Sequence, residues 1–352
     1  MNRKAFEQEI LRYLKADQRR HPAMEQQDAV KFVFQAMLGS GHLLPSRTAA
    51  EEYITQETEQ LSAGVGEPLC EPLSPSWCRL SLRGAKERNI TPPVITGLML
   101  TSDSGPQFTR QDVFSFCKRL AVSEEKLITD QNALVRITDE TWLPSHSPAY
   151  RNKYHPAYRV ISTGWISCME AIGKITDQQG ERILVTIDGP CASGKTTLSG
   201  KLAEVFGAAV VHTDDYVIPH AQKTAERLAV PGGNCDADRL ASEVVAPWKR
   251  GDPVIYRRYD CKNDTLLPEE RLPDCRVLIL EGSYCGLPAI RKHADVRIFV
   301  CASMETRERR LRQRESAQSI QMFYDRWIPL EDAYFAEYQL PDDSCIVINE
   351  QE

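Results

Sequence analysis

Apolar residues recur at intervals of three and four positions through the first sixty residues of the chain. One such stripe begins at Phe6 and ends at Leu14, and a second, mostly apolar stretch covers residues 30–38 and stops at Gly39. The same spacing returns, among more acidic residues, over residues 47–61. Since positions three and four apart share one face of a helix, the pattern predicts three helices at the start of the chain.

The remainder of the first half mixes helical and extended patterns. A connector rich in proline and glycine at residues 62–75 precedes an alternating segment at 77–83 that predicts a strand. Thr109 is a candidate N-cap for a further helix, and residues 160–172 again have helical spacing. We expect a mainly α-helical N-terminal domain over residues 1–165, with a small strand element and no chemistry that its sequence identifies.

Two parts of this domain contain residues of a functional type. Residues 141–159 are dense in aromatic, histidine and arginine side chains, which suits either a binding surface at the junction with the second half or a packed aromatic hinge. The hinge is the favoured interpretation. His42, beside Gly41, is a candidate ligand or base, but a packing or capping role is favoured because no cluster of partner residues lies nearby.

The second half, residues 166–352, alternates short apolar runs with segments that have helical spacing. The runs are typical of buried strands, since they are short and rich in β-branched residues. They cover residues 183–187, 208–212, 277–280, 296–300 and 345–348. Two of them end directly before an acidic residue and a third ends two positions before one, and these ends carry the candidate chemistry.

The first of these runs leads into the segment that is most informative about function. GPCASGKT, at residues 189–196, matches the phosphate-loop (Walker A) pattern G-x-x-x-x-G-K-[ST], and helical spacing resumes behind it. Glycines allow backbone amides to converge on a polyphosphate, Lys195 can reach the β- and γ-phosphates, and Thr196 can hold Mg²⁺. A plain glycine-rich turn is the disfavoured alternative. The candidate nucleotide-binding residues are Gly189, Cys191, Ala192, Ser193, Gly194, Lys195, Thr196 and Thr197.

Acidic residues stand at the ends of two further runs. Asp214 follows the run at 208–212, where one ionised carboxylate could position an acceptor hydroxyl and take its proton. The alternative is that Asp214 and Asp215 only cap the next turn. Glu281 ends the run at 277–280 and could hold Mg²⁺ directly or through water, unless it is a structural residue at a strand end.

Candidate acceptor-binding residues lie in two segments between these runs. In a glycine-containing loop, Asp236 caps the helix behind it, binds substrate hydroxyls, or does both, and Arg239 follows on that helix. Residues 254–260 mix aromatic and guanidinium side chains suited to a small anionic or cyclic substrate, although an exposed strand would show the same alternation. Tyr256 and Arg258 are the candidates there.

Five arginines fall within eight positions at residues 307–314. On a helix Arg307, Arg310 and Arg314 share one face, from which three guanidinium groups could close over phosphates as a lid. A solvated helix face would more often interleave acidic residues, so the lid is favoured. The candidate catalytic residues are Asp214, Lys195, Arg310 and Arg314.

Composition excludes several classes of protein. The chain has 352 residues, of which 42% are hydrophobic, so it can bury a full core. A net charge of −6 indicates no general affinity for nucleic acid, and no apolar run is long enough for a membrane span or an export signal. Eleven scattered cysteines, none in a C-x-x-C pair, suit reduced thiols in a cytoplasmic protein. The sequence leaves a homo-oligomer open.

The order of motifs in the second half resembles a known family. A strand, GPCASGKTT, TDDY, GGNCDADRL, LILEG and an arginine-rich helix follow one another as in the uridine kinase-like branch of P-loop kinases, which includes uridine kinase, phosphoribulokinase and pantothenate kinase. The resemblance covers about residues 180–350. It implies an α/β fold with a five-stranded parallel sheet flanked by helices, and it implies ATP and Mg²⁺ as the nucleotide and the metal.

The same resemblance implies roles for individual residues. Asp214 matches the catalytic base of that family, Glu281 its metal-associated acid, and Asp236 an acid that holds sugar hydroxyls of the substrate. Arg310 and Arg314 correspond to its lid arginines.

The chain departs from uridine kinases at residues 256–261, where YRRYDC lacks the histidine of the pyrimidine-reading pattern. The leading hypothesis is an ATP-dependent kinase that transfers the γ-phosphoryl group to a hydroxyl of a small metabolite, for which a nucleoside is one candidate. The alternative is a nucleotide-dependent regulatory module whose ATP state controls a partner docked on the N-terminal half. An acceptor base and lid arginines favour the kinase, because a switch needs no acceptor base. A third hypothesis is that residues 1–165 bind the acceptor.

Overall fold

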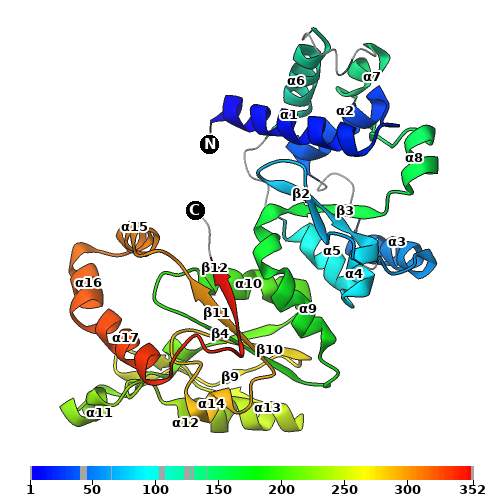
Figure 1. Cartoon of the computed structure of the whole chain (residues 1–352). Coiled ribbons are helices and arrows are strands. Elements are labelled where there is room, and N and C mark those ends of the chain that lie inside the picture. The colour runs from blue at the N-terminus through cyan, green and yellow to red at the C-terminus, as the bar shows by residue number, and fades with distance from the viewer. Residues whose placement is uncertain are drawn as a thin grey trace. The chain divides into compact units, whose positions relative to one another are not determined.

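The computed structural model describes residues 2–39, 46–64, 66–102, 108–122, 128, 131–139 and 141–349. The chain divides into two compact units, Met1–Ile166 and Ser167–Glu352 (Figure 1). The candidate His42 lies outside the described residues. Among the described helices, none combines the length and the apolar character that crossing a membrane requires.

Helices and one small antiparallel sheet make up the N-terminal unit. The three helices predicted for the first sixty residues are confirmed, and the second ends at Gly39, whose φ of 65° suits glycine. The helices are α1 (Arg3–Arg20), α2 (Gln26–Leu38), α3 (Arg47–Gln60), α4 (Leu82–Glu87), α5 (Pro92–Leu100), α6 (Arg110–Val122), α7 (Gln131–Arg136) and α8 (Pro148–Tyr154). The sheet consists of β1 (Cys70–Pro72), β2 (Trp77–Ser81) and β3 (Tyr158–Ser162), in that order.

The helix predicted over residues 160–172 is wrong in its first part. Val160 and Ile161 belong to β3, a 3₁₀ segment (Thr163–Cys168) follows, and only α9 (Met169–Asp177) is α-helical. Every residue of β3 pairs with a residue of β2, and β-branched side chains suit a strand that completes a sheet. This pairing joins segments far apart in the sequence, so the local spacing gave no sign of it.

Two other predictions in this unit are refined. The strand predicted at residues 77–83 ends at Ser81, whose hydroxyl accepts a backbone N–H in the first turn of α4 and so begins a helix. The aromatic residues of 141–159 are packed, as the favoured interpretation expected. The rings of His146 and Tyr150, for example, stack with their centroids 4.3 Å apart.

A five-stranded parallel sheet organises the C-terminal unit, as the resemblance implied. Its order is β12-β11-β4-β10-β5, and every neighbouring pair is parallel. In this register Glu281 lies beside Ile187 and His212, so the carboxyl ends of three strands meet at one edge. The strands are β4 (Ile183–Asp188), β5 (Ala209–His212), β10 (Val277–Glu281), β11 (Val296–Cys301) and β12 (Cys345–Asn349).

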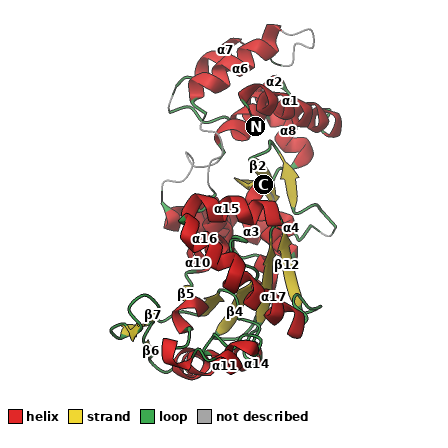
Figure 2. Ribbon diagram, turned by 90° about the vertical axis from the view of Figure 1, so that its left-hand side faces the viewer, coloured by secondary structure: helices red, strands yellow, loops and turns green. Residues whose placement is uncertain are grey.

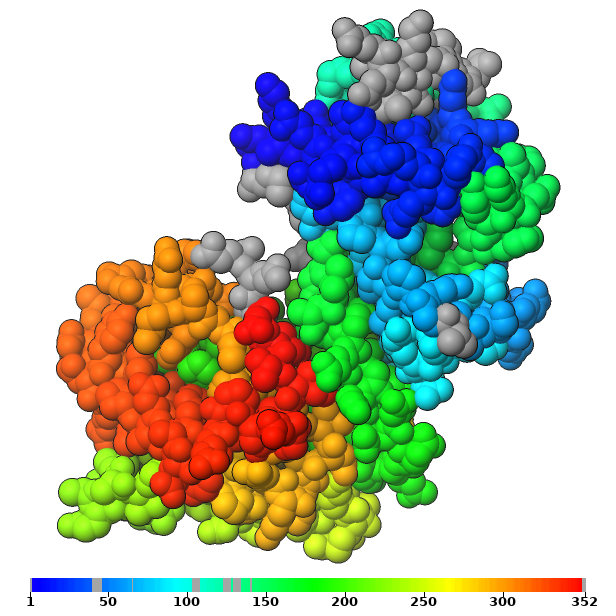
Figure 3. Space-filling view, viewed as in Figure 1, coloured from blue at the N-terminus to red at the C-terminus, as the bar shows by residue number. Residues whose placement is uncertain are grey.

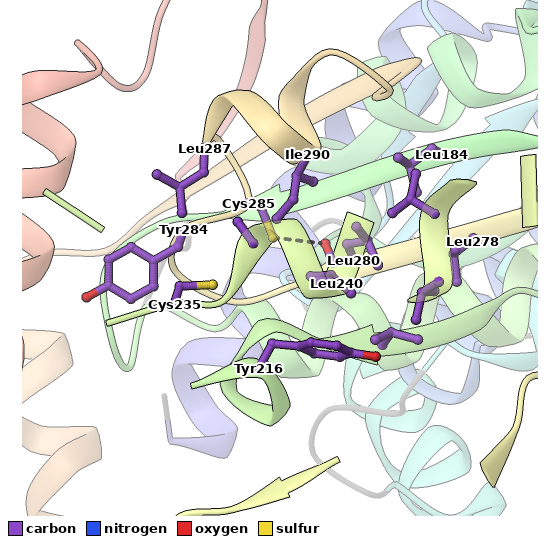
Figure 4. Packing of buried hydrophobic residues seen from close by; sticks show 14 of the residues in the cluster. Leu184, Tyr216, Cys235, Leu240, Leu278, Leu280, Tyr284, Cys285, Leu287 and Ile290 are labelled. Atoms are coloured by element: carbon purple, nitrogen blue, oxygen red, sulfur yellow. Dashed lines mark hydrogen bonds between the residues drawn. The ribbon is translucent and has the colours of Figure 1, made fainter. Parts of the chain in front are cut away.

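Helices cover both faces of this sheet (Figure 1). On one face α9 packs against β11, and α10 (Lys195–Phe206) packs against β4, β10 and β5. On the other, side chains of α12 (Ala237–Leu240) and α14 (Pro288–Arg291) share a buried cluster with the strands (Figure 4). Coverage of both faces explains why the strands appear in the sequence as continuous apolar runs. The cluster includes Leu184, Val211, Leu240, Leu278, Leu280 and Ile290.

The remaining elements lie between β5 and β10 and after β11. A segment with two short strand pairs projects from the sheet (Figure 2). It contains β6 (Ile255–Tyr256) paired with β9 (Glu270–Arg271), and β7 (Tyr259–Asp260) paired with β8 (Thr265–Leu266). The other elements are 3₁₀ turns at Thr213–Tyr216 and His220–Gln222, α11 (Ala225–Ala229), a π-helical segment (Ala241–Val245), α13 (Ala246–Arg250), α15 (Met304–Arg314), α16 (Ala317–Met322), a second π-helical segment (Phe323–Trp327) and α17 (Ile328–Glu337).

A substitution at Gly189, the first residue after β4, tests the geometry of the turn that follows this strand. Its φ is 140°, and a Cβ atom there would stand 2.3 Å from the carbonyl oxygen of Val300. Backbone cannot easily give way, so we expect Gly189→Ala to lower the free energy of unfolding by about 2 kcal/mol or more.

Gly200 in α10 is the matched control for this substitution, to be compared by chemical denaturation. A Cβ atom there meets nothing within 4 Å, so Gly200→Ala should be neutral or stabilise the protein by about 0.5–1 kcal/mol. Equal effects of the two substitutions would contradict the geometry described for the turn.

Candidate active site

The loop between β4 and α10 has an unusual backbone conformation. Gly189, Ala192 and Gly194 have positive φ angles of 140°, 58° and 109°. Such residues, separated by ordinary ones, curl the chain as the phosphate-loop pattern predicts. Ala192 adopts this conformation without being glycine, which costs roughly 1–2 kcal/mol. The contacts around the loop must therefore hold it in place.

Asp188, the last residue of β4, anchors the start of the loop. Its Oδ1 accepts the N–H of Gly189 at 2.7 Å. Its Oδ2 accepts the N–H of Gly286 at 2.8 Å and the hydroxyl of Tyr334 at 2.6 Å. Burial raises the pKa of the Asp188 carboxyl despite these three hydrogen bonds. The residue thus ties β4 to the loop after β10 and to α17.

Glu331 of α17 is a second anchor, which sequence patterns alone did not reveal. Its Oε2 accepts the N–H of Cys191 at 2.9 Å, and its Oε1 accepts the hydroxyl of Ser283 at 2.6 Å. The Cys191 amide, one of the predicted nucleotide-binding groups, therefore bonds to a protein carboxylate here. The one available signal is an acid on the inward face of a helix, three positions from both Ile328 and Tyr334.

Two arginines of α15 hold the carbonyl groups of the same loop. Arg307 is only 7% exposed, and its Nε donates to the carbonyl oxygen of Cys191 at 2.8 Å. Its Nη2 lies 4.0 Å from Oε2 of Glu331. Arg310 donates from Nη1 to the carbonyl oxygen of Ala192 at 3.2 Å. Arg307 thus supports the loop from a buried position, whereas its spacing had suggested only a lid.

Arg314 lies one turn further along α15 and makes other contacts. Its Nε pairs with Glu315 at 3.1 Å, and its guanidinium lies 5.8 Å from the ring centroid of Phe323. Its role in a lid stays a prediction. Figure 3 shows a hollow in the surface inside the arc of α15, α16 and α17, with a segment in the green of the phosphate-loop region at its floor.

Groups able to bind a phosphate gather where the loop enters α10. Lys195 is 8% exposed, and its Nζ donates to the carbonyl oxygen of Pro190 at 2.9 Å. Ser193 is fully buried, and its hydroxyl has no hydrogen-bond partner among the described residues. Thr196 and Thr197 are exposed in the first turn, where backbone N–H groups have no acceptor within the helix.

Thr196 and Glu281 meet, as their predicted roles at a metal require. The Thr196 hydroxyl donates to Oε1 of Glu281 at 3.1 Å. The other carboxylate oxygen of Glu281 lies 2.5 Å from Nδ1 of His212, a contact that raises the pKa of the histidine. Sequence patterns placed His212 in a strand but gave it no role in the site. A hydroxyl and a carboxylate side by side are the oxygen ligands that Mg²⁺ prefers, so these residues fit that ion.

No group of three or more acidic, histidine or cysteine side chains in the described part of the chain is arranged to hold a metal by itself. In phosphoryl-transfer enzymes generally, Mg²⁺ takes one or two protein ligands and completes its shell with phosphate oxygens and water.

Asp214 lies in the 3₁₀ turn directly after β5. It keeps exposed surface, but the surrounding protein removes enough water to raise the pKa of its carboxyl. Lys195 lowers this pKa, while Glu281 and Glu331 raise it, so Asp214 is within electrostatic reach of the loop. Its carboxyl accepts no hydrogen bond from the described residues, which gives the capping alternative no support.

The predicted acceptor-binding residues Asp236 and Arg239 both have partners in the protein. Asp236 caps α12, since its Oδ1 accepts the N–H of Arg239 at 3.3 Å. Arg239 donates to the carbonyl oxygens of Arg257 and Asp215 at 3.0 and 3.2 Å, and it lies over the ring of Tyr216. The capping role of Asp236 is thus confirmed. Substrate contacts of both residues stay predictions.

Tyr256 and Arg258 share one carboxylate, Glu270. Nε of Arg258 lies 2.7 Å from Oε1 of Glu270, and the Tyr256 hydroxyl lies 3.5 Å from Oε2. Burial raises the pKa of the Asp215 carboxyl, whereas the charges of His212 and Arg258 lower it. Two short strands account for the alternation at residues 254–260, and substrate contacts of Tyr256 and Arg258 stay predictions.

A curled loop with a lysine, and carboxylates at the ends of the neighbouring parallel strands, define the C-terminal unit as a P-loop kinase. Residues 184–319 match the phosphoribulokinase / uridine kinase family. The C-terminal unit belongs to this family, as the resemblance of its motifs implied.

Individual relatives cover the same part of the chain. Cytidylate kinase from Acidiphilium cryptum (strain JF-5) is 30% identical over 159 residues, covering 41% of this chain and 72% of that enzyme. Cytidylate kinase from Bradyrhizobium diazoefficiens is 32% identical over 145 residues, covering 36% of this chain and 66% of that enzyme. A solved structure described as a possible uridine kinase from Bacillus stearothermophilus is 20% identical with a TM-score of 0.39, covering 51% of this chain and 95% of that one.

Arg307 and Arg312 of α15 offer a matched test of the loop contacts. Arg307 is buried against the loop, whereas Arg312 is exposed and pairs with Glu308 on its own helix. Arg307→Gln should lower the free energy of unfolding by about 2–4 kcal/mol, because Glu331 loses its buried cation. Arg312→Gln should change it by less than about 0.5 kcal/mol. Denaturant titration compares the variants, and a mild effect at position 307 would show that the loop does not depend on this arginine.

Proposed function

We propose that the protein is an ATP-dependent kinase that transfers the γ-phosphoryl group to a hydroxyl of a small metabolite, for which a nucleoside is the first candidate. One observation carries this proposal. Thr196 and Glu281 are paired at 3.1 Å beside the loop, and Asp214 lies at the same edge of the sheet. A hydroxyl and a carboxylate for the ion, with a second carboxylate for the acceptor, are the parts that phosphoryl transfer needs.

Lys195 and the loop amides other than those of Gly189 and Cys191, which carboxylates already hold, are assigned to the β- and γ-phosphates. The Lys195 ammonium bonds only to a neutral carbonyl oxygen among the described residues, and a phosphate is a stronger acceptor for it. Arg310 already lies on the loop, so its charge can offset negative charge on the transferring group. Arg314 can contribute its charge to the transferring group only after its ion pair with Glu315 breaks.

Thr196 and Glu281 are the residues that would hold Mg²⁺. When bound, this ion neutralises charge on the phosphate oxygens. His212 fixes the orientation of Glu281 through one carboxylate oxygen and leaves the other beside the Thr196 hydroxyl. The histidine therefore acts as a positioning residue.

Asp214 is the proposed base. It accepts the proton of the acceptor hydroxyl while the acceptor oxygen forms its bond to the γ-phosphorus. The bond from that phosphorus to the oxygen bridging to the β-phosphate breaks, and ADP leaves. Asp236, Tyr256 and Arg258 are assigned to the acceptor, since a polar group of this kind suits a molecule with several hydroxyls.

A screen of nucleosides, sugars and pantothenate-like alcohols for acceptor-dependent ADP release tests this function. With an active acceptor, Asp214→Asn should lower turnover by about 10²–10⁴-fold, because it removes the base. Nucleotide affinity should change little. Asp332→Asn, at an exposed acid of α17, is the control that should retain full turnover.

Turnover that survives Asp214→Asn would contradict the role of this residue. Acceptor-independent ATP hydrolysis, together with a change in partner binding when ATP is added, would favour a nucleotide-dependent regulatory module. Turnover with cytidine monophosphate and with none of the screened alcohols would place the acceptor among nucleotides, the class named in the cytidylate kinase relatives.

The raised pKa of Asp214 predicts the acid side of the pH profile. The base must be ionised, so kcat/KM should rise with pH through a midpoint above 3.8, the ordinary value for aspartic acid. After burial, the charge of Glu331 also raises this pKa, so Glu331→Gln should move the midpoint to lower pH. Glu337→Gln, at an exposed acid of the same helix, should leave it in place. A midpoint that ignores Glu331→Gln would argue against Asp214 as the titrating group.

A further inference from the structure

The N-terminal unit contains a cavity that phosphoryl transfer does not use. Its volume is about 610 Å³, and residues of α2, α3, α4 and α8 contribute to its walls. Cavities of roughly 300–1,000 Å³ commonly hold small organic ligands. Every residue assigned to phosphoryl transfer lies in the other unit, so this cavity needs an explanation of its own.

Three cations line this cavity without a carboxylate partner among the described residues. Lys31 donates to the carbonyl oxygen of Pro144 at 3.2 Å, and Arg83 donates to the Ser62 hydroxyl at 3.4 Å. The exposed Arg151 side chain has no hydrogen bond or ion pair within the described part of the chain. Each of these groups can therefore bind an anion without first breaking an ion pair.

The acids beside this first cavity are already engaged. Glu57, the one acid among the described residues that line the cavity, pairs with Arg159 at 2.6 Å. The Asp28 carboxylate forms a hydrogen bond with a ring nitrogen of His146 at 2.9 Å. It also accepts hydrogen bonds from the N–H and the hydroxyl of Ser147. The positive charge of the cavity is consequently not offset by its own walls.

The pKa of Lys31 reflects this excess of positive charge. Burial, together with the charges of Arg79 and Arg151, lowers the pKa of its ammonium group to about 8. A bound anion would favour the charged form and reverse this effect. The cavity is therefore suited to a negatively charged ligand.

A smaller cavity of about 220 Å³ adjoins the first, since both are lined by Arg83 and His155. Arg79 lines this second cavity and is 4% exposed. One of its nitrogens pairs with Asp17 at 2.9 Å, while Nε and Nη2 have no hydrogen-bond partner among the described residues. These two nitrogens are covered by protein, and the Phe32 ring, 5.2 Å from the guanidinium, partly compensates for the missing hydrogen bonds.

Aromatic and acidic side chains complete the second cavity. Tyr150, Tyr154 and Tyr158 line it. Two acids line it as well: Glu71 pairs with Arg20 at 2.9 Å, and Glu67 accepts the Ser81 hydroxyl at 3.3 Å, so the organic group and not the phosphate belongs in this part. Tyrosine rings offer flat apolar faces with a polar tip. They suit a ligand with a ring as well as a charged group.

We propose that the two adjoining cavities bind a small organic phosphate monoester. Guanidinium and ammonium groups hold a phosphate dianion by charge-assisted hydrogen bonds, and Arg83, Arg151 and Lys31 supply them. The tyrosine-lined part takes the organic group. This site does not rest on the proposed kinase activity.

Calorimetric titration of the full-length protein tests this site, both in the wild type and in a Lys195→Ala background that weakens phosphate binding at the loop. The probes are uridine 5′-monophosphate and ribose 5-phosphate, with uridine, ribose and inorganic phosphate as comparisons. At least one monoester should bind in both backgrounds, about tenfold or more tightly than its uncharged parent or inorganic phosphate.

Arg151→Glu should weaken this binding by about tenfold or more, the loss expected for one charge-assisted hydrogen bond. Lys31→Gln should weaken it in the same direction. Arg136→Glu, at an exposed arginine of α7 that lines neither cavity, should leave it unchanged. Thermal denaturation checks that each variant is folded.

Three results would overturn this site. They are the absence of monoester binding in the wild type, equally tight binding of inorganic phosphate or the uncharged parents, and binding that Lys195→Ala abolishes but Arg151→Glu preserves. These experiments measure binding and not turnover. Their results can therefore be interpreted even if the protein proves not to be a kinase.

Discussion

The rest of the candidate active site depends on two buried carboxylates that hold the phosphate loop. Asp188 and Glu331 accept the N–H groups of Gly189 and Cys191, and α17 contributes to both contacts through Tyr334 and Glu331 itself. A buried carboxylate without partners is strongly unfavourable. The shape of the loop and the packing of α17 therefore stabilise each other, and neither is expected to persist alone.

The arginines of α15 also hold the loop, and they fix the orientation of its peptide groups. Arg307 and Arg310 hold the carbonyl oxygens of Cys191 and Ala192. Within one planar trans peptide the carbonyl and the following N–H point in opposite directions. The N–H of Ala192 is therefore turned away from α15. In this way the helix that carries the candidate lid arginines also orients the loop that would bind the nucleotide.

Local patterns in the sequence were sufficient for the sheet and the loop. Short β-branched runs identified the five strands, and the spacing of Gly189, Gly194 and Lys195 identified the loop, because each signal lies within a few residues. Glu331 and Arg307 escaped prediction as supports of the loop because their partners lie more than a hundred positions away.

Helical spacing did not show which arginines of α15 are buried. It also did not show that residues 158–162 form a strand instead of a helix. It placed Arg307 and Arg314 on one face, yet only the first is buried, since spacing does not say where along a helix the contact ends. Val160 and Ile161 looked helical for a related reason. Their pairing with β2 is a tertiary contact with residues about eighty positions away, so it cannot be predicted from the neighbouring sequence.

Calorimetric titration of the full-length protein with ATP in the presence of Mg²⁺ tests the central claim most directly, which is that the loop held by Asp188 and Glu331 binds a triphosphate. We predict saturable binding of one nucleotide per chain that is lost or greatly weakened in Lys195→Ala. Absence of binding in the wild type, or binding that Lys195→Ala leaves intact, would contradict the account.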